Sequence, residues 1–166
     1  MWRAGEIELC ETPAEAIHPT LYPIGCCFLC RRQSFLDLGG YDEVFTPFFW
    51  EDVDLGYRAW RRGLATLHVP EAVCLHEGSA TLAETHSLEA REEAYFRNKV
   101  LFHLRNLSDP ELRAENMGAW AAYALFDHKQ ERRRSLAAAI DAFERSGRRA
   151  EAGLDDHEIL ARAGVR

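Results

Sequence analysis

The chain has 166 residues, enough for one ordinary domain with its own hydrophobic core. Hydrophobic residues make up 47% of it and charged residues 28%, which is the composition of a globular protein rather than a disordered one. The formal net charge of −7 argues against a nucleic-acid-binding protein, because neutralising phosphates requires a basic surface.

Two features bear on the cellular compartment. The longest apolar run, Ala119 to Phe126, is far shorter than the roughly 20 residues that span a bilayer, and the start of the chain lacks the basic and apolar regions of a signal peptide. We therefore expect a cytoplasmic protein. Its five cysteines should then be reduced, and we expect them to be small core side chains: Cys10, Cys26, Cys27, Cys30 and Cys74.

In chain order, the first predicted element is a buried strand over residues 21–30, followed by a short helix over 33–38. Gly39 and Gly40 end that helix, and an aromatic loop then runs over residues 41–50.

The next element is the most clearly marked one. Residues 51–62 predict a helix, because acidic residues fill the first turn, arginines fill the last turn, and Gly63 provides a stop. The four-residue spacing of Asp54 and Arg58 predicts an ion pair along this helix. Two short strands follow, over residues 64–69 and 72–76.

The rest of the chain has a helical pattern. Apolar residues recur at helical spacing, and Pro110 suits the first turn of a new helix. We expect four helices, marked by the segments 96–107, from 110 onward, 136–143 and 155–163. The predicted organisation is a mixed unit over residues 1–88 and a helical extension over 89–166.

The acidic start of the predicted helix at residue 51 has two readings. Glu51, Asp52 and Asp54 complement the helix dipole, which accounts for acids at a helix start without any function. The aromatic loop before them favours a second reading, because aromatic rings stack on the apolar face of a sugar while carboxylates accept its hydroxyl hydrogens. The same aromatics could equally fill the core.

Two further motifs have a functional and a structural reading. His76 ends a predicted strand just before a glycine-containing loop, where functional groups tend to lie, although a lone histidine is more often structural. Cys27 and Cys30 have the spacing of a metal or redox pair, but a zinc site needs a second ligand pair that the sequence does not supply at a set spacing.

Taken together and in order, these motifs resemble the second half of the family 2 glycosyltransferases, and they are similar to galactosyltransferase C-terminal domains. The resemblance rests on three segments, and it is specific because they occur jointly. They are Gly39-Gly40-Tyr41-Asp42-Glu43, then Trp50-Glu51-Asp52-Val53-Asp54-Leu55-Gly56-Tyr57-Arg58, then Val73, His76 and Ser79. The strong match covers about residues 24–80. The implied fold is α/β: the C-terminal portion of a GT-A fold, with a small mixed sheet and a helical tail.

The resemblance implies a transferase that moves a sugar from a nucleotide-sugar donor to a saccharide or lipid-linked acceptor, with inversion, for cell-surface polysaccharide. Asp52 would be the catalytic base, and Glu51 would bind an acceptor hydroxyl or orient the loop. His76 would complete the coordination of Mn²⁺ or Mg²⁺ on the donor diphosphate.

The resemblance also implies supporting roles. The residues expected to shape the acceptor site are Gly39, Gly40, Asp42 and Trp50. Asp54 and Arg58 are expected to support the acidic start of the helix.

The chain departs from the family before residue 21, where nothing resembles the nucleotide-binding half or its Asp-x-Asp motif. A missing N-terminal half is therefore an expected partner. The run Arg132-Arg133-Arg134 would allow peripheral contact with the inner membrane face, although a solvated helix face explains it as well. Two alternative functions stay open: a non-catalytic carbohydrate-binding or partner module, and a small metal or redox protein built on the cysteines.

Overall fold

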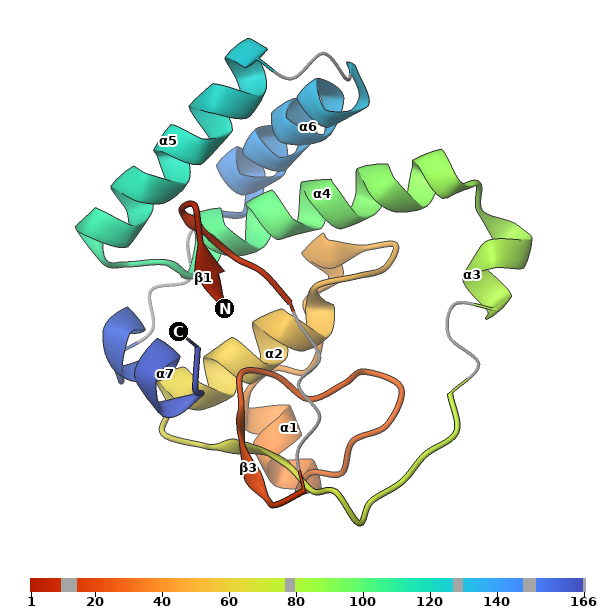
Figure 1. Cartoon of the computed structure of the whole chain (residues 1–166), viewed down its shortest axis with the longest axis vertical. Helices are drawn as coiled ribbons and strands as arrows, with labels where there is room; N and C mark the ends of the chain where they lie inside the picture. Colours follow the sequence, from red (N-terminus) through yellow and green to blue (C-terminus); the bar gives the residue numbers. More distant parts are fainter. Residues whose placement is uncertain (10–14, 77–79, 127–129, 148–151, 166) are drawn as a thin grey trace.

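The computed structural model describes residues 1–9, 15–76, 80–126, 130–147 and 152–165. Figure 1 shows a group of packed helices above a smaller region of short strands and loops. The elements in chain order are β1 (Trp2–Arg3), β2 (Glu6–Ile7), β3 (His18–Thr20), α1 (Arg32–Asp37), a 3-10 turn η1 (Glu43–Phe45), α2 (Glu51–Arg61), β4 (Thr66–His68), α3 (Ala80–Thr85), α4 (Leu88–Asn106), α5 (Pro110–Phe126), α6 (Gln130–Ser146) and α7 (Asp156–Arg162).

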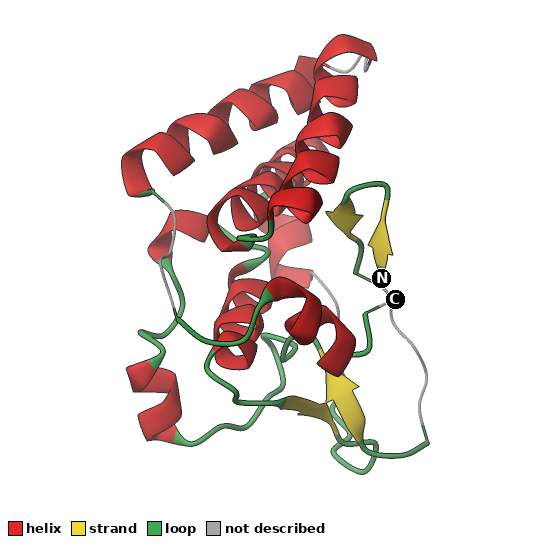
Figure 2. Cartoon of the chain, turned by 90° about the vertical axis from the view of Figure 1, so that its left-hand side faces the viewer, coloured by secondary structure: helices red, strands yellow, loops and turns green. Residues whose placement is uncertain are grey.

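Helix α4 is the centre of the packing. It lies against α6 along much of its length and contacts both α2 and α5 (Figures 1 and 2). Val100, Leu101 and Phe102 of α4 are fully buried, together with Val53 and Tyr57 of α2. The predicted helical tail is confirmed, and its second helix begins at Pro110 as expected.

The strands are shorter than the sequence predicted, and most lie at other positions. Among the described residues, β1 pairs with β2 and β3 pairs with β4, each antiparallel, so the protein has two small sheets. The predicted strand over residues 21–30 is wrong, because β3 ends at Thr20 and the segment continues as an irregular chain. The prediction over 72–76 is wrong as well, whereas β4 lies inside the range predicted over 64–69.

The prediction that the cysteines are buried is wrong for the four that lie among the described residues. Cys26, Cys27, Cys30 and Cys74 are free and exposed, and Cys10 lies outside the described residues. Their apolar neighbours are exposed too, since Leu29 is 99% and Leu75 97% accessible. Residues 21–30 and 72–76 have the apolar composition of buried strands. Among the described residues, however, no further strand pairs with either segment or covers it.

Glycine lets two segments approach closely at the middle of α2. A side-chain carbon at Gly56 would come within 2.5 Å of the Tyr22 Cα atom and 2.6 Å of the Leu21 carbonyl oxygen. Any larger residue would therefore push this chain segment off the helix. This close contact places residues 21 and 22, which follow β3, against α2, the helix that begins with the candidate catalytic residues.

The N-terminal hairpin, which the sequence did not predict, packs on α4 and α5. Glu6 is buried and accepts hydrogen bonds from Lys99 at 2.9 Å, Trp120 at 3.0 Å and Tyr123 at 3.0 Å. Burial opposes ionisation of Glu6, but the hydrogen bond and charge of Lys99 outweigh it and lower the pKa of this carboxyl.

The same hairpin buries a neutral histidine. The Nε2 atom of His103 accepts the backbone N–H of Ile7 at 2.8 Å, so its Nδ1 donates to the Lys99 carbonyl at 2.7 Å. Burial lowers the pKa of His103 from 6.5 to about 4. The hairpin and α4 thus hold the uncharged ring.

Stability should consequently fall in mild acid. An unfolded histidine gains a proton as the pH falls through about 6.5, whereas folded His103 stays neutral down to about pH 4. The unfolded state binds more protons in this window, so the free energy of unfolding should fall by up to roughly 3 kcal/mol between these pH values. Urea melts across this range would measure it. His103→Gln should flatten this part of the profile; an unchanged slope in that variant would assign the effect to other groups.

A buried carboxylate joins the last helix to α2. Asp156 accepts the Tyr57 hydroxyl at 2.6 Å and the backbone N–H groups of Ser108 and Asp109, both at 2.6 Å, and it forms an ion pair with Arg61. Burial would raise the pKa of Asp156, but these hydrogen bonds and the Arg61 charge outweigh it and lower the pKa. Figure 1 shows α7 beside the end of α2 accordingly.

Among the described residues, none of the helices combines the length and the hydrophobicity that a bilayer-spanning segment needs.

Candidate functional site

The candidate catalytic carboxylates lie at the start of α2, as the sequence predicted. Asp52 is partly buried, and its Oδ2 atom accepts the backbone N–H of Gly25 at 3.0 Å. Its Oδ1 atom accepts the N–H of Val53 at 2.8 Å. The exposed segment after β3 therefore touches Asp52 directly and holds its side chain in one orientation.

The surroundings of Asp52 and Glu51 at the start of α2 raise the pKa of both carboxyl groups. Burial raises the pKa of Asp52, although the N–H groups of Gly25 and Val53 oppose the rise. Burial also raises the pKa of Glu51, and the Asp52 charge adds to that effect. The Oε2 atom of Glu51 is buried and lacks a hydrogen-bond partner among the described residues. Tyr41 lies close enough that burial, followed by the charges of Asp52 and Glu51, raises its pKa.

Arg58 joins α2 to the glycine loop that precedes it. The ion pair predicted from spacing is present: the Nε atom of Arg58 donates to Asp54 Oδ2 at 2.7 Å, and both side chains are buried. The remaining nitrogens of Arg58 donate to the carbonyls of Leu38 at 2.5 Å and Gly40 at 2.8 Å. Asp54 also accepts the Asn106 side chain at 2.9 Å, so α2, the loop and α4 are fixed together.

The glycine loop itself has the backbone that glycine permits. Gly39 and Gly40 have φ angles of 83° and 66°, in the left-handed region. Asp42 follows and caps η1 by accepting the N–H of Val44 at 3.1 Å, while its other oxygen pairs with Arg105 of α4 at 2.9 Å. The structure thus gives Asp42 a bracing role, and its part in acceptor binding stays a prediction.

The aromatic loop enters α2 through two left-handed residues. Phe49 and Trp50 have φ angles of 75° and 72°, which are strained for non-glycine residues and which cluster at functional sites in proteins. Asn98 of α4 holds the loop in place: its buried amide nitrogen lies 2.6 Å from the Phe45 carbonyl, 2.8 Å from that of Phe48 and 3.0 Å from that of Phe49.

Trp50 does not offer a stacking surface for a sugar. Its side chain is 2% exposed, and its ring packs 5.2 Å from that of Phe102 and 5.7 Å from that of His103. Of the two readings of the aromatic loop, the core reading is therefore correct for this residue. The expectation that the Trp50 ring contacts an acceptor is corrected, while Tyr41 beside Asp52 remains exposed.

His76 lies in an exposed, irregular segment, and Ser79 lies outside the described residues. Among the described residues, no group of three or more His, Cys, Asp or Glu side chains is arranged to hold a metal ion. This part of the chain therefore does not fit a complete Mn²⁺ or Mg²⁺ centre. Metal ligation by His76 stays a prediction.

Sequence reasoning assigned no role to the residues of α4 that brace the site. Asn98 supports the aromatic loop, and the neighbouring Arg97 donates to the Val44 carbonyl at 2.9 Å. Asn106 supports Asp54. Asparagine inside a helix is a weak helix former, which was a local signal for Asn98 and Asn106.

Comparison with known proteins gives a partial relationship. Over 66 residues the chain is 39% identical to N-acetylglucosaminyl-diphospho-decaprenol L-rhamnosyltransferase of Mycobacterium tuberculosis, in each of two strains. The chain is related to a glycosyltransferase. The matched segment is 37% of this chain and spans 21% of the length of these relatives.

The other two comparisons found no match. No protein-family model matches the chain. No solved structure matches it either, so the fold is described from its own geometry.

Proposed function

We propose that this chain is the acceptor-side part of an inverting glycosyltransferase that transfers a deoxyhexose such as rhamnose to a lipid-linked, diphosphate-bearing N-acetylglucosamine. The single observation that carries the proposal is the setting of Asp52 in a chain related to a rhamnosyltransferase. Its carboxylate is oriented by two backbone N–H groups and partly removed from water at the start of α2.

In the proposed reaction, Asp52 takes the proton of an acceptor hydroxyl. The acceptor oxygen forms a bond with the anomeric carbon of the donor while the bond from that carbon to the diphosphate oxygen breaks, and the nucleoside diphosphate leaves. A positioned carboxylate contributes about 10²–10⁴-fold to such a step. The raised pKa of Asp52 makes it a stronger base than a fully solvated aspartate. Charge stabilisation of the leaving diphosphate would come from the donor-binding part, since the described residues hold no group of metal ligands.

The donor-binding part would lie outside this chain. Three exposed apolar side chains support this assignment: Leu29, Val73 and Leu75 lie in the segments whose sequences have strand character but which pair with nothing described. Where such side chains form one apolar surface, another part of the protein is expected to cover it. Among the described residues the β3–β4 sheet has two strands, and the edges of such a sheet can pair with further strands.

A transfer assay tests the proposed function. The native polypeptide would be incubated with N-acetylglucosaminyl-diphospho-polyprenol and a panel of nucleotide-activated sugars, with the lipid product analysed by mass spectrometry. We expect one added sugar residue, most efficiently with an activated deoxyhexose. An intact acceptor with every donor, under conditions in which the protein is folded, would contradict the proposal.

A further inference from the structure

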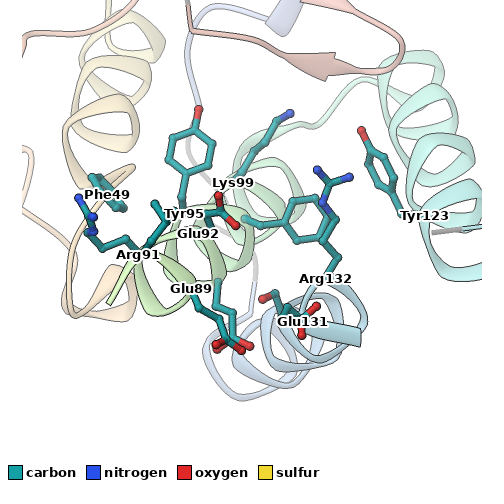
Figure 3. Close-up of a pocket in the computed structure, with 13 residues that line it drawn as sticks. Phe49, Glu89, Arg91, Glu92, Tyr95, Lys99, Tyr123, Glu131 and Arg132 are labelled. Carbon is teal, nitrogen blue, oxygen red and sulfur yellow. The ribbon is translucent and has the colours of Figure 1, made fainter. Parts of the chain in front are cut away.

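A pocket on the helical side of the molecule has no assigned role. It has a volume of about 680 Å³ and opens among α4, the start of α6 and the end of α5 (Figure 3). Small-molecule sites typically measure about 300–1,000 Å³. Its lining includes Phe49, Arg91, Glu92, Tyr95, Lys99 and Arg132. Phe49 also lies in the aromatic loop, two residues before Glu51, so this residue belongs both to the pocket and to the loop that leads into α2.

Most charged side chains that line the pocket already interact with other described residues. Lys99 forms an ion pair with Glu6 at 2.9 Å. Arg134 forms an ion pair with Glu93 at 2.6 Å and also pairs with Glu89 and Glu131. The guanidinium of Arg132 stacks over Phe96 and Tyr123, 5.7 Å and 5.8 Å from the ring centres. Arg132 thus lines the pocket, whereas Arg134 is not a lining residue and pairs with three glutamates that are.

Two adjacent charged residues differ from this pattern. Neither Arg91 nor Glu92 forms an ion pair with another residue in the described part of the chain. The Nε atom of Arg91 is buried without a hydrogen-bond partner there. A buried donor without a partner is costly, so the Arg91 guanidinium is not fully satisfied by the described residues and has donors to offer a ligand in the pocket. Figure 3 shows the Arg91 side chain extending toward Phe49 and the Glu92 side chain lying beside Tyr95.

The ligand chemistry follows from the balance of these groups. Among the described residues that line the pocket, Arg91 and Glu92 are one cation and one carboxylate without an ion pair, which leaves no excess positive charge for a phosphate. A lipid tail would have to bury both charges. A neutral sugar suits them, because its hydroxyls both donate to Glu92 and accept from Arg91. Phe49 and Tyr95, whose rings meet edge to face at 5.7 Å, supply aromatic surface for its apolar side.

We propose that this pocket is a saccharide subsite that receives a neutral sugar ring of the acceptor remote from the reacting hydroxyl. The link to an acceptor rests on the proposed function, whereas saccharide binding in the pocket stands independently of it. Phe49 joins the two sites, and Asn98 fixes the backbone of that residue.

The test is an NMR titration of the isotopically labelled chain with tri-N-acetylchitotriose, a neutral oligosaccharide. We expect amide shifts in residues 88–99 and 130–135 and at Phe49. Arg91→Gln and Glu92→Gln should each weaken binding roughly tenfold or more, because each removes a charge-assisted hydrogen bond. Glu144→Gln, an exposed glutamate of α6 outside the pocket, should leave the affinity unchanged.

The absence of shifts in these helices, or unchanged affinity in both pocket variants, would overturn the proposal. Asp52→Asn should bind the trisaccharide as the wild type does. Binding in the pocket without sugar transfer would therefore refute the proposed function and keep the subsite, whereas transfer without binding in the pocket would refute the subsite alone.

Discussion

Replacing Asp52 by asparagine is expected to lower the rate of sugar transfer by about 10²–10⁴-fold in the native polypeptide. Asparagine has nearly the same shape, and its carbonyl oxygen can still accept the Gly25 N–H that Asp52 accepts at 3.0 Å. The fold should therefore survive, while the group that takes the hydroxyl proton is gone. Steady-state rates with saturating donor and acceptor would measure the loss.

Asp37→Asn is the matched control, because Asp37 is an exposed aspartate of α1 that bonds Gln33 at 2.7 Å. Its rate should equal that of the wild type. The alternative of a non-catalytic carbohydrate-binding module makes a different prediction: wild type and Asp52→Asn would bind saccharide alike, and neither would turn over. Full activity in Asp52→Asn would remove Asp52 from the mechanism.

Replacing Asp156 by alanine is expected to destabilise the protein by about 3–5 kcal/mol. The change leaves the buried Arg61 without its carboxylate partner and leaves the N–H groups of Ser108 and Asp109 without an acceptor. In a chain of this length such a loss lowers the melting temperature by roughly 6–20 °C. Thermal unfolding followed by circular dichroism would measure it.

Asp141→Ala provides the comparison for this variant. Asp141 pairs with Arg145 on the exposed surface of α6, where an ion pair contributes about 0–1 kcal/mol. Its melting temperature should stay close to that of the wild type. Equal melting temperatures for the two alanine variants would show that α7 is not held to α2 through Asp156.

Local sequence patterns predicted α2 and its ion pair because the signals lie within a few residues. Acidic residues at the start, arginines near the end and Gly63 afterwards defined a helix that the structure has from Glu51 to Arg61. The four-residue spacing then placed Asp54 beside Arg58. What spacing alone could not show is that Arg58 also binds the carbonyls of Leu38 and Gly40.

The strand predictions failed for a different reason. Residues 21–30 and 72–76 have the apolar composition of buried strands, but a strand forms only where a neighbour supplies hydrogen bonds and cover. The described residues supply neither, so Leu29 and Leu75 remain exposed and the cysteines beside them do too. The composition of a segment indicates its tendency to form a buried strand. Whether it is buried depends on the neighbouring strands and helices in the folded protein.

The braces of the site depend on contacts between distant residues. Asn98 reaches carbonyls about fifty positions earlier in the chain, and Asp156 reaches Tyr57 across 99 positions. No periodicity links such residues. The burial of Trp50 has the same origin, because it follows from the packing of α4 over the aromatic loop.

The central claim is that this chain is the acceptor-side part of a larger transferase, and the mass of the native polypeptide tests it most directly. The chain has a mass of 19.0 kDa. We predict a markedly larger intact mass in the source cell, with peptides of a nucleotide-binding part preceding residue 1. An intact mass of 19.0 kDa, with no donor-binding protein co-purifying, would contradict the claim and favour the non-catalytic module.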